Sequence, residues 1–243
     1  MSSVYRFPLQ HPQYLYPPSK NPYWSKIQAL KGLAFTDHET ERSPGQWRSK
    51  WDNELPPSSR ELHVEIGCNA GHVIVEWAKM HPSRSYIGID WKFKPIFRAV
   101  EKSQKQNLKN LIFLRAHAQR LNYIFGPQEV DFLSLFFPDP WPRKSQWKNR
   151  LINSENLKQI AQVMKPSGIF HIKTDHPDYF EWILNAVGEL PDTWKILEMT
   201  RDLHQNHPSP QNLKIPEVTL FEKLFIQAQI PIQSLKLQII HTP

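Results

Sequence analysis

Short apolar runs alternate with longer amphipathic stretches along most of this chain, beginning near residue 61. In residues 61–66 apolar and polar side chains alternate, a glycine-containing turn follows at 67–71, and residues 72–80 place apolar side chains at helical spacing. Alternation with a period of two is typical of strands, and spacings of three and four are typical of helices. The pattern therefore predicts a strand, a glycine turn and a helix.

The same succession repeats toward the C-terminus. Further strands are predicted at residues 85–90, 111–114, 132–137, 169–175, 193–199 and 218–228, and further helices at residues 94–106, 153–164 and 178–189. One more strand, at an edge of the sheet, is predicted after residue 230. Strands that alternate with helices predict an α/β fold of the Rossmann-like type, with a seven-stranded, mostly parallel sheet and helices on both faces.

The ends of the chain differ from this regular part. Residues 1–60 hold many prolines and scattered aromatic residues without a sustained period, and we interpret them as an N-terminal extension that packs its rings on the main domain or on a partner. Basic residues between these rings suit contact with RNA, and the alternative is an arm that only wraps the domain. The main domain is then residues 61–230, and residues 231–243 form a C-terminal tail.

A proline-rich loop follows the predicted strand at 132–137. Prolines alternate with other residues at 138, 140 and 142, so Asp139 and Trp141 should project from a stiff loop. In an open α/β sheet the carboxyl ends of the strands form the ligand-binding edge. This loop is therefore the first candidate for the functional site.

Four basic residues follow this acid and this ring: Arg143, Lys144, Lys148 and Arg150. The chain of 243 residues carries a net charge of +7, which favours a polyanionic partner. A flat ring beside a carboxylate and a cationic patch suits a nucleobase on a phosphate backbone. Two simpler alternatives are a ring packed under the loop and a solvated basic face.

Other classes of protein are disfavoured by composition. There is no run of 18 apolar residues and no apolar signal-peptide core, so we expect a cytoplasmic protein without a membrane partner. Cys68 is the single cysteine, which rules out an intrachain disulfide and zinc held by cysteine pairs. The histidines have no metal-ligand spacing supported by acids, and we predict no metal.

A second acid, Asp90, indicates a binding site for a nucleotide-like ligand. Asp90 ends the predicted second strand, downstream of the glycine turn at Gly67, Asn69 and Gly71, where a carboxylate is placed to bind ribose hydroxyls. Five β/α units followed by strands resemble the class I S-adenosylmethionine-dependent methyltransferases. Dinucleotide-binding Rossmann domains share the opening but not the proline loop.

The residues also resemble a particular family, the bacterial tRNA (guanine-N7-)-methyltransferases. The similarity runs from about residue 61 to 182, with a shorter piece at 219–222, and its most specific elements are Phe-Pro-Asp-Pro-Trp-Pro-Arg-Lys at 137–144 and Lys-Asn-Arg-Leu at 148–151. The resemblance implies S-adenosylmethionine as cofactor, tRNA as partner, and methylation of N7 of a guanine in the variable loop. The oligomeric state is left open between monomer and homodimer.

The resemblance also implies roles for individual residues. It makes Asp139 the active-site carboxylate and gives Glu65 and Asp90 contacts with the cofactor, beside the turn residues Gly67, Asn69 and Gly71. It implies substrate contacts for Arg143, Asp175, Thr219 and Glu222, which join Trp141, Lys144, Lys148 and Arg150 from the loop argument. For Asp175 the alternative is a helix N-cap, and for Lys173 burial and a place in the site both remain open.

Two positions depart from the family pattern. Asn69 replaces the middle glycine of the turn, and Ala-His-Ala at 116–118 stands where the family has Gly-Asp-Ala, so His117 would meet the adenine edge. Asn tolerates a left-handed backbone better than most residues, so the turn is expected to survive. The departures motivate an alternative function, an RNA-binding protein on a degenerate scaffold with weak or no cofactor binding. Methylation of a different nucleic-acid position is the other alternative.

Overall fold

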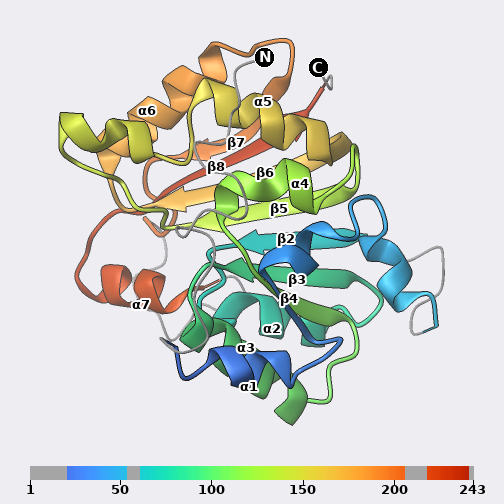
Figure 1. Cartoon of the computed structure of the whole chain (residues 1–243). Helices are drawn as coiled ribbons and strands as arrows, with labels where there is room; N and C mark the ends of the chain where they lie inside the picture. The colour runs from blue at the N-terminus through green and yellow to red at the C-terminus, as the bar shows by residue number, and fades with distance from the viewer. Residues whose placement is uncertain (1–20, 54–60, 206–217, 241–243) are drawn as a thin grey trace.

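The computed structural model describes residues 21–53, 61–205 and 218–240, and in these residues eight strands form one sheet with helices on both faces (Figure 1). The α/β architecture and the mostly parallel sheet confirm the prediction. The eighth strand is β1 (Ala34–Thr36), which pairs in parallel with β4 and comes from the predicted N-terminal extension. The sheet order is β1-β4-β3-β2-β5-β6-β8-β7.

Five central strands run parallel: β2 (Leu62–Ile66), β3 (Ser85–Asp90), β4 (Leu111–Arg115), β5 (Val130–Phe136) and β6 (Met164–Thr174). Their carboxyl ends meet at one edge of the sheet, which lies at the left in Figure 1. The antiparallel strands β7 (Trp194–Thr200) and β8 (Gln233–Ile239) complete the sheet beside β6.

Alternate residues of the strands supply two separate cores. Leu133 and Leu135 of β5 face one core, and Phe132 and Phe136 face the other. The first core is covered by α4 (Leu121–Ile124), α5 (Ser154–Val163) and α6 (Pro177–Gly188). The second is covered by α1 (Trp24–Gln28), α2 (His72–Met80) and α3 (Phe93–Lys105). Strands covered on both faces read as nearly continuous apolar runs, which is why they were predictable.

The C-terminal part corrects two predictions. The strand expected at 218–228 is a helix, α7 (Leu220–Gln227), because Thr219 and Glu222 form a capping box that starts it. The strand expected after residue 230 exists as β8, but it lies between β6 and β7 and not at an edge. No helix in the described residues is both long enough and apolar enough to span a bilayer.

The N-terminal segment is built into the main domain. It contains the short helices η2 (Asp37–Glu41) and η3 (Trp47–Trp51), and Trp47 and Trp51 at the ends of η3 are buried, which confirms the expected packing of these rings. The buried carboxylate of Glu129 accepts hydrogen bonds from the backbone N–H groups of Gly45 and Trp47, at 2.8 and 2.7 Å. The Trp47 indole also donates to the carbonyl of Ile124, at 2.6 Å. Tyr5, Tyr14 and Tyr16 lie outside the described residues.

Trp47→Ala should lower the free energy of unfolding by about 3–5 kcal/mol, because it empties a fully buried site and removes the indole hydrogen bond. Urea unfolding would measure the loss. Trp91→Ala is the matched control, since half of Trp91 is exposed, and it should change stability by less than about 1 kcal/mol. Equal effects of the two substitutions would contradict an integrated N-terminal segment.

Candidate active site

The glycine turn between β2 and α2 is held in a left-handed backbone conformation at three positions. The φ angles are 74° at Gly67, 48° at Asn69 and 67° at Gly71. The N–H groups of Gly67 and Cys68 both donate to the carbonyl of Ile89, at 2.8 and 3.0 Å. Asn69 therefore keeps the turn intact, as expected for an amide side chain. A Cβ on Gly67 would meet no atom within 4 Å, so the backbone there is open to a ligand.

Two carboxylates support this turn. Asp90, at the end of β3, accepts hydrogen bonds from the N–H groups of Asn69 and Lys92, at 3.1 and 2.9 Å. Glu65, at the end of β2, is 4% exposed and accepts from the N–H of Ile74 at 3.2 Å. Burial raises the pKa of both groups, that of Glu65 to about 8 with a contribution from the nearby charge of Asp90. The turn thus sits on two acids that are costly to ionise.

The proline loop turns toward the same place. The N–H of Phe137 donates to the carbonyl of Lys173 at 2.8 Å, and φ is 53° at Phe137 and 45° at Trp141. These positive φ angles lie on either side of Pro138, Asp139 and Pro140 and redirect the chain after β5. Asp139 is exposed, and Trp141 is half-buried.

A cavity of about 340 Å³ joins the glycine turn to the proline loop. Its wall includes Gly67, Asp90, His117, Asp139 and Trp141. Burial, together with Arg115 and Arg120, lowers the pKa of His117, so its ring is neutral near pH 7. The glycine turn and the proline loop therefore border one pocket.

The cavity wall also contains residues that the sequence analysis did not select. Trp91 follows Asp90 directly and is half exposed, and Asn149 reaches the wall from η6 (Lys144–Asn149). The position of Trp91 after a strand-ending acid was a usable signal. Asn149 gave none, because its placement depends on how η6 folds back.

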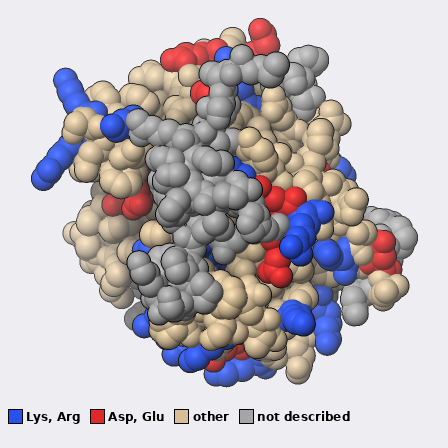
Figure 2. Space-filling model, in the orientation of Figure 1, with Lys and Arg blue, Asp and Glu red and all other residues tan. Residues whose placement is uncertain are grey.

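The four basic residues after the loop separate into two kinds. Arg143, Lys144 and Lys148 are exposed, and Lys and Arg side chains project over this segment at the left of Figure 2. Arg150 is only 2% exposed, and its Nε donates to the carbonyl of Pro140 at 2.8 Å. The prediction that Arg150 binds tRNA phosphates is therefore wrong, because its guanidinium is enclosed by protein.

Three predicted residues lie around the end of β6 and α7. Asp175 follows β6 and is half-buried, and it is not the cap of α6, because His176 caps that helix by accepting from the N–H of Tyr179 at 3.3 Å. Thr219 caps α7. Neither Thr219 nor Glu222 lines the cavity, and both take part in the capping box of α7, so their substrate contacts stay a prediction.

Glu222 is the centre of a buried ionic cluster. It is fully buried, and its carboxylate lies 3.1 and 3.2 Å from Nζ of Lys173 and 2.6 Å from Nε2 of His204. Lys173 is therefore buried in β6 and paired, which resolves the choice that the sequence left open. The cluster ties α7 and the segment after β7 to the strand that ends at the site.

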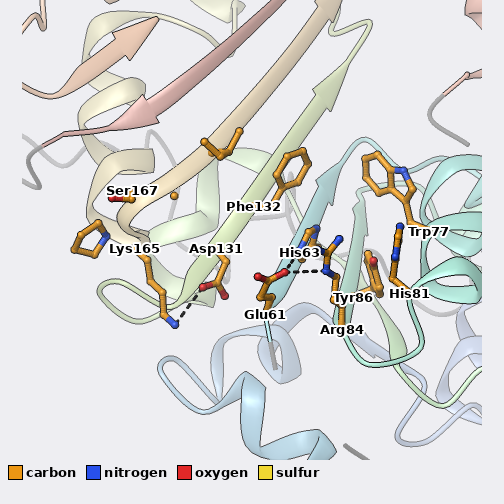
Figure 3. A pocket seen from close by; sticks show the side chains of 13 residues that line it. Glu61, His63, Trp77, His81, Arg84, Tyr86, Asp131, Phe132, Lys165 and Ser167 are labelled. Atoms are coloured by element: carbon orange, nitrogen blue, oxygen red, sulfur yellow. Dashed lines mark hydrogen bonds and ion pairs between the residues drawn. The ribbon is translucent and has the colours of Figure 1, made fainter. Parts of the chain in front are cut away.

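A second cavity, of about 410 Å³, lies at the opposite edge of the sheet (Figure 3). Its charged residues are paired: Glu61 with Arg84 at 2.8 Å, and Asp131 with Lys165 at 3.2 Å. None of the residues predicted to form the site lines it, and it lies at the amino ends of the strands, away from the ligand-binding edge. Within the described part of the chain, no group of three or more His, Cys, Asp and Glu residues is placed to hold a metal ion.

Solved structures share this fold. The 16S rRNA methyltransferase KamB matches with a TM-score of 0.55 at 18% identity, over 79% of this chain and 96% of that one. The strand order and the site at the carboxyl edge define a class I S-adenosylmethionine-dependent methyltransferase fold.

Proteins of similar sequence identify the family within this class of methyltransferases. Residues 59–235 match the model of a family described as "Putative methyltransferase". A tRNA (guanine-N(7)-)-methyltransferase of Bdellovibrio bacteriovorus is 32% identical over 85% of this chain and 95% of its own length. Another, of Lachnoclostridium phytofermentans, is 34% identical over 82% of this chain and 87% of its own length. The chain belongs to the tRNA (guanine-N(7)-)-methyltransferase family.

Burial of Glu65 predicts a pH-dependent stability. Its pKa is about 8 in the folded protein and near 4.5 when exposed, so between these values the folded state keeps a proton that the unfolded chain releases. Glu65 therefore favours folding fully below about pH 4.5, and this contribution is lost as the pH rises toward 8.

Urea unfolding from pH 5 to 8 would measure this effect. Glu65→Gln, which cannot ionise, should gain stability relative to the unliganded wild type as the pH rises, by at most about 1.4 kcal/mol per pH unit. Exposed Glu189 gives the control Glu189→Gln, whose difference from wild type should stay constant. A constant difference for Glu65→Gln would mean that Glu65 is ionised in the folded protein.

Proposed function

We propose that this protein transfers a methyl group from S-adenosylmethionine to N7 of a guanine in the variable loop of tRNA. The observation that carries the proposal is the single cavity bounded by both the open glycine turn and the carboxylate of the proline loop. In a chain of this family, such a cavity brings a cofactor and a base together.

The residues around the turn fit the cofactor. Gly67 leaves room for close approach of the ligand, Asp90 faces the cavity where ribose hydroxyls would lie, and neutral His117 can exchange a hydrogen bond with the adenine edge. Glu65, behind the turn, keeps its proton near pH 7, and a nearby ammonium group of the cofactor would lower its pKa and favour the carboxylate. When bound, S-adenosylmethionine supplies an electrophilic methyl group on a sulfonium.

Asp139 is assigned to holding the guanine. The N7 atom of guanine has an in-plane lone pair and no proton, so the nitrogen needs no base to attack. The carboxylate of Asp139 instead accepts hydrogen bonds from N1–H and the N2 amino group, and so fixes the direction in which N7 points. Alignment of this kind can supply several kcal/mol of barrier reduction. Asp175, half-buried at the end of the neighbouring strand, supports the same edge of the site.

Trp141 is assigned to stacking on the base. Its ring lines the cavity two residues after Asp139 and is half-buried, which leaves part of the ring accessible. Stacking of a base on an aromatic side chain contributes roughly 1–3 kcal/mol. A Trp141 ring packed fully under the loop could not reach the base, and this contribution to binding would be absent.

The alternative of a degenerate scaffold is less well supported. It was motivated by Asn69 and His117, but Asn69 keeps the left-handed turn and His117 lines the cavity without closing it. Calorimetry with S-adenosylmethionine separates the two functions, since a chain that binds tRNA but no cofactor fits only the alternative.

The proposal is tested by incubating unmodified tRNA with the purified protein and S-adenosylmethionine labelled in the methyl group, followed by nucleoside analysis. The expected product is N7-methylguanosine from the variable loop. Label on an exocyclic amine, or at another position of the tRNA, would overturn the proposed chemistry. Absence of label would overturn the activity itself.

Asp139→Asn should abolish turnover, because an amide presents an N–H toward one of the two guanine donors. We expect kcat to fall by at least about 100-fold. The dissociation constant for S-adenosylmethionine, measured by calorimetry, should change by less than about twofold, because the cofactor contacts lie at the turn. An Asp139→Asn variant with full activity would remove this assignment.

Neutralising the exposed basic residues should reduce the salt dependence of tRNA binding. The variant with Arg143, Lys144 and Lys148 all changed to Gln should lose up to about three units of the slope of log K against log salt, because fewer counterions are released on binding. A matched control changes the exposed Lys79, Lys105 and Lys195, which lie away from the site, to Gln. Equal slopes for the two triple variants would reject the assignment.

A further inference from the structure

Arg150 differs from its basic neighbours in where its charge lies. It belongs to the same short stretch as the exposed Lys144 and Lys148, yet it is 2% exposed. Its guanidinium carbon lies 4.8 Å from the ring centre of Trp147, 5.0 Å from that of Tyr179 and 4.9 Å from that of Trp182. Burying a cation is unfavourable unless neighbouring groups compensate for lost water, and three aromatic rings provide part of that compensation.

The rings of Trp147, Tyr179 and Trp182 form an aromatic box around Arg150, and hydrogen bonds hold this box in place. The Tyr179 hydroxyl accepts from the N–H of Ile152 at 3.1 Å, and the Trp182 indole donates to the carbonyl of Ile152 at 2.7 Å. The rings of Trp147 and Trp182 also contact each other, with centres 5.4 Å apart. Tyr179 and Trp182 belong to α6, so a regular helix holds two of the three rings that surround the guanidinium.

The hydrogen bond from this box reaches the middle of the proline loop. Nε of Arg150 donates to the carbonyl of Pro140 at 2.8 Å, and Pro140 stands between Asp139 and Trp141. The prolines at 138, 140 and 142 have no N–H, so the loop lacks the donors with which most turns hold themselves. Arg150 supplies a donor from outside the loop.

The loop also needs such support because of its backbone. Phe137 and Trp141, neither of them glycine, have φ angles of 53° and 45°. Such conformations are costly and persist only where surrounding contacts determine them. The hydrogen bond to Pro140 falls between these two residues, next to the carboxylate and the ring that are assigned to the base.

We infer that Arg150 is a positioning residue, which fixes the proline loop through the carbonyl of Pro140 so that Asp139 and Trp141 meet the substrate base in the reactive orientation. The inference rests on the proposed function, since it assigns Arg150 a part in that same site. It distinguishes Arg150 from Arg143, Lys144 and Lys148, which are assigned to phosphates. Only a guanidinium has both the planar shape that stacks in the box and an Nε–H at this point of the side chain.

The test compares Arg150→Lys and Arg150→Met with Lys195→Met, which removes an exposed charge away from the site. For each protein, kcat and KM for tRNA, cofactor affinity and the salt slope of tRNA binding are measured. For both Arg150 variants kcat should fall on the order of 10- to 100-fold, with cofactor affinity and salt slope unchanged. Lys195→Met should keep both kcat and the salt slope of the wild type.

The outcomes separate the possible roles. Arg150→Lys keeps the charge in the aromatic box, so it gives a folded protein to measure even if Arg150→Met does not fold. Wild-type kcat in the Arg150→Lys variant would overturn the inference, as would a loss of salt slope with unchanged kcat, which is the signature of a phosphate contact. If the wild-type protein itself makes no N7-methylguanosine, the proposed function fails. If it does and Arg150→Lys equals it, this inference alone fails.

Discussion

The pairing of β2 with β5 is the constraint on which the site depends. The two strands run parallel, and Ile66 of β2 lies opposite Leu135 of β5, so both strands end at nearly the same height. The glycine turn follows the end of β2, and the proline loop follows the end of β5. The cavity lies between the turn and the loop. A slip of one residue would turn the buried side chains of a strand to the opposite face. The apolar residues on both faces of β5 therefore fix the distance between turn and loop.

The parts of the fold that the sequence predicted are those determined by local pattern. The parallel strands are covered on both faces, and helices such as α5 begin at a residue with a capping side chain, Asn153, whose Oδ1 accepts from the N–H of Asn156 at 2.8 Å. The shared pocket of turn and loop was also predictable, because parallel strands bring their carboxyl ends to one edge. Local sequence is sufficient for these features.

One error came from a local signal that was not used, and the others came from features that only tertiary contacts decide. The apolar residues after Thr219 are compatible with a strand or a helix, and a capping box selects the helix. The place of β8 within the sheet depends on its partners and not on its own residues. Arg150 looked like one more surface cation, because the sequence does not reveal that Tyr179 and Trp182 of α6 enclose it. The sequence likewise does not reveal that the carboxylate of Glu222 is paired with Lys173 and His204.

The position of β8 has a consequence for synthesis of the protein. Within the described residues β7 pairs only with β8, and β8 also pairs with β6 along residues 169–174. Until residues 233–239 have left the ribosome, β6 has an open side and β7 has no neighbour in the sheet. Ser234 of this late strand lies opposite Lys173, whose carbonyl receives the N–H of Phe137 where the proline loop begins. The pairing of β6, the strand on which the proline loop begins, is therefore completed only after β8 has been synthesised.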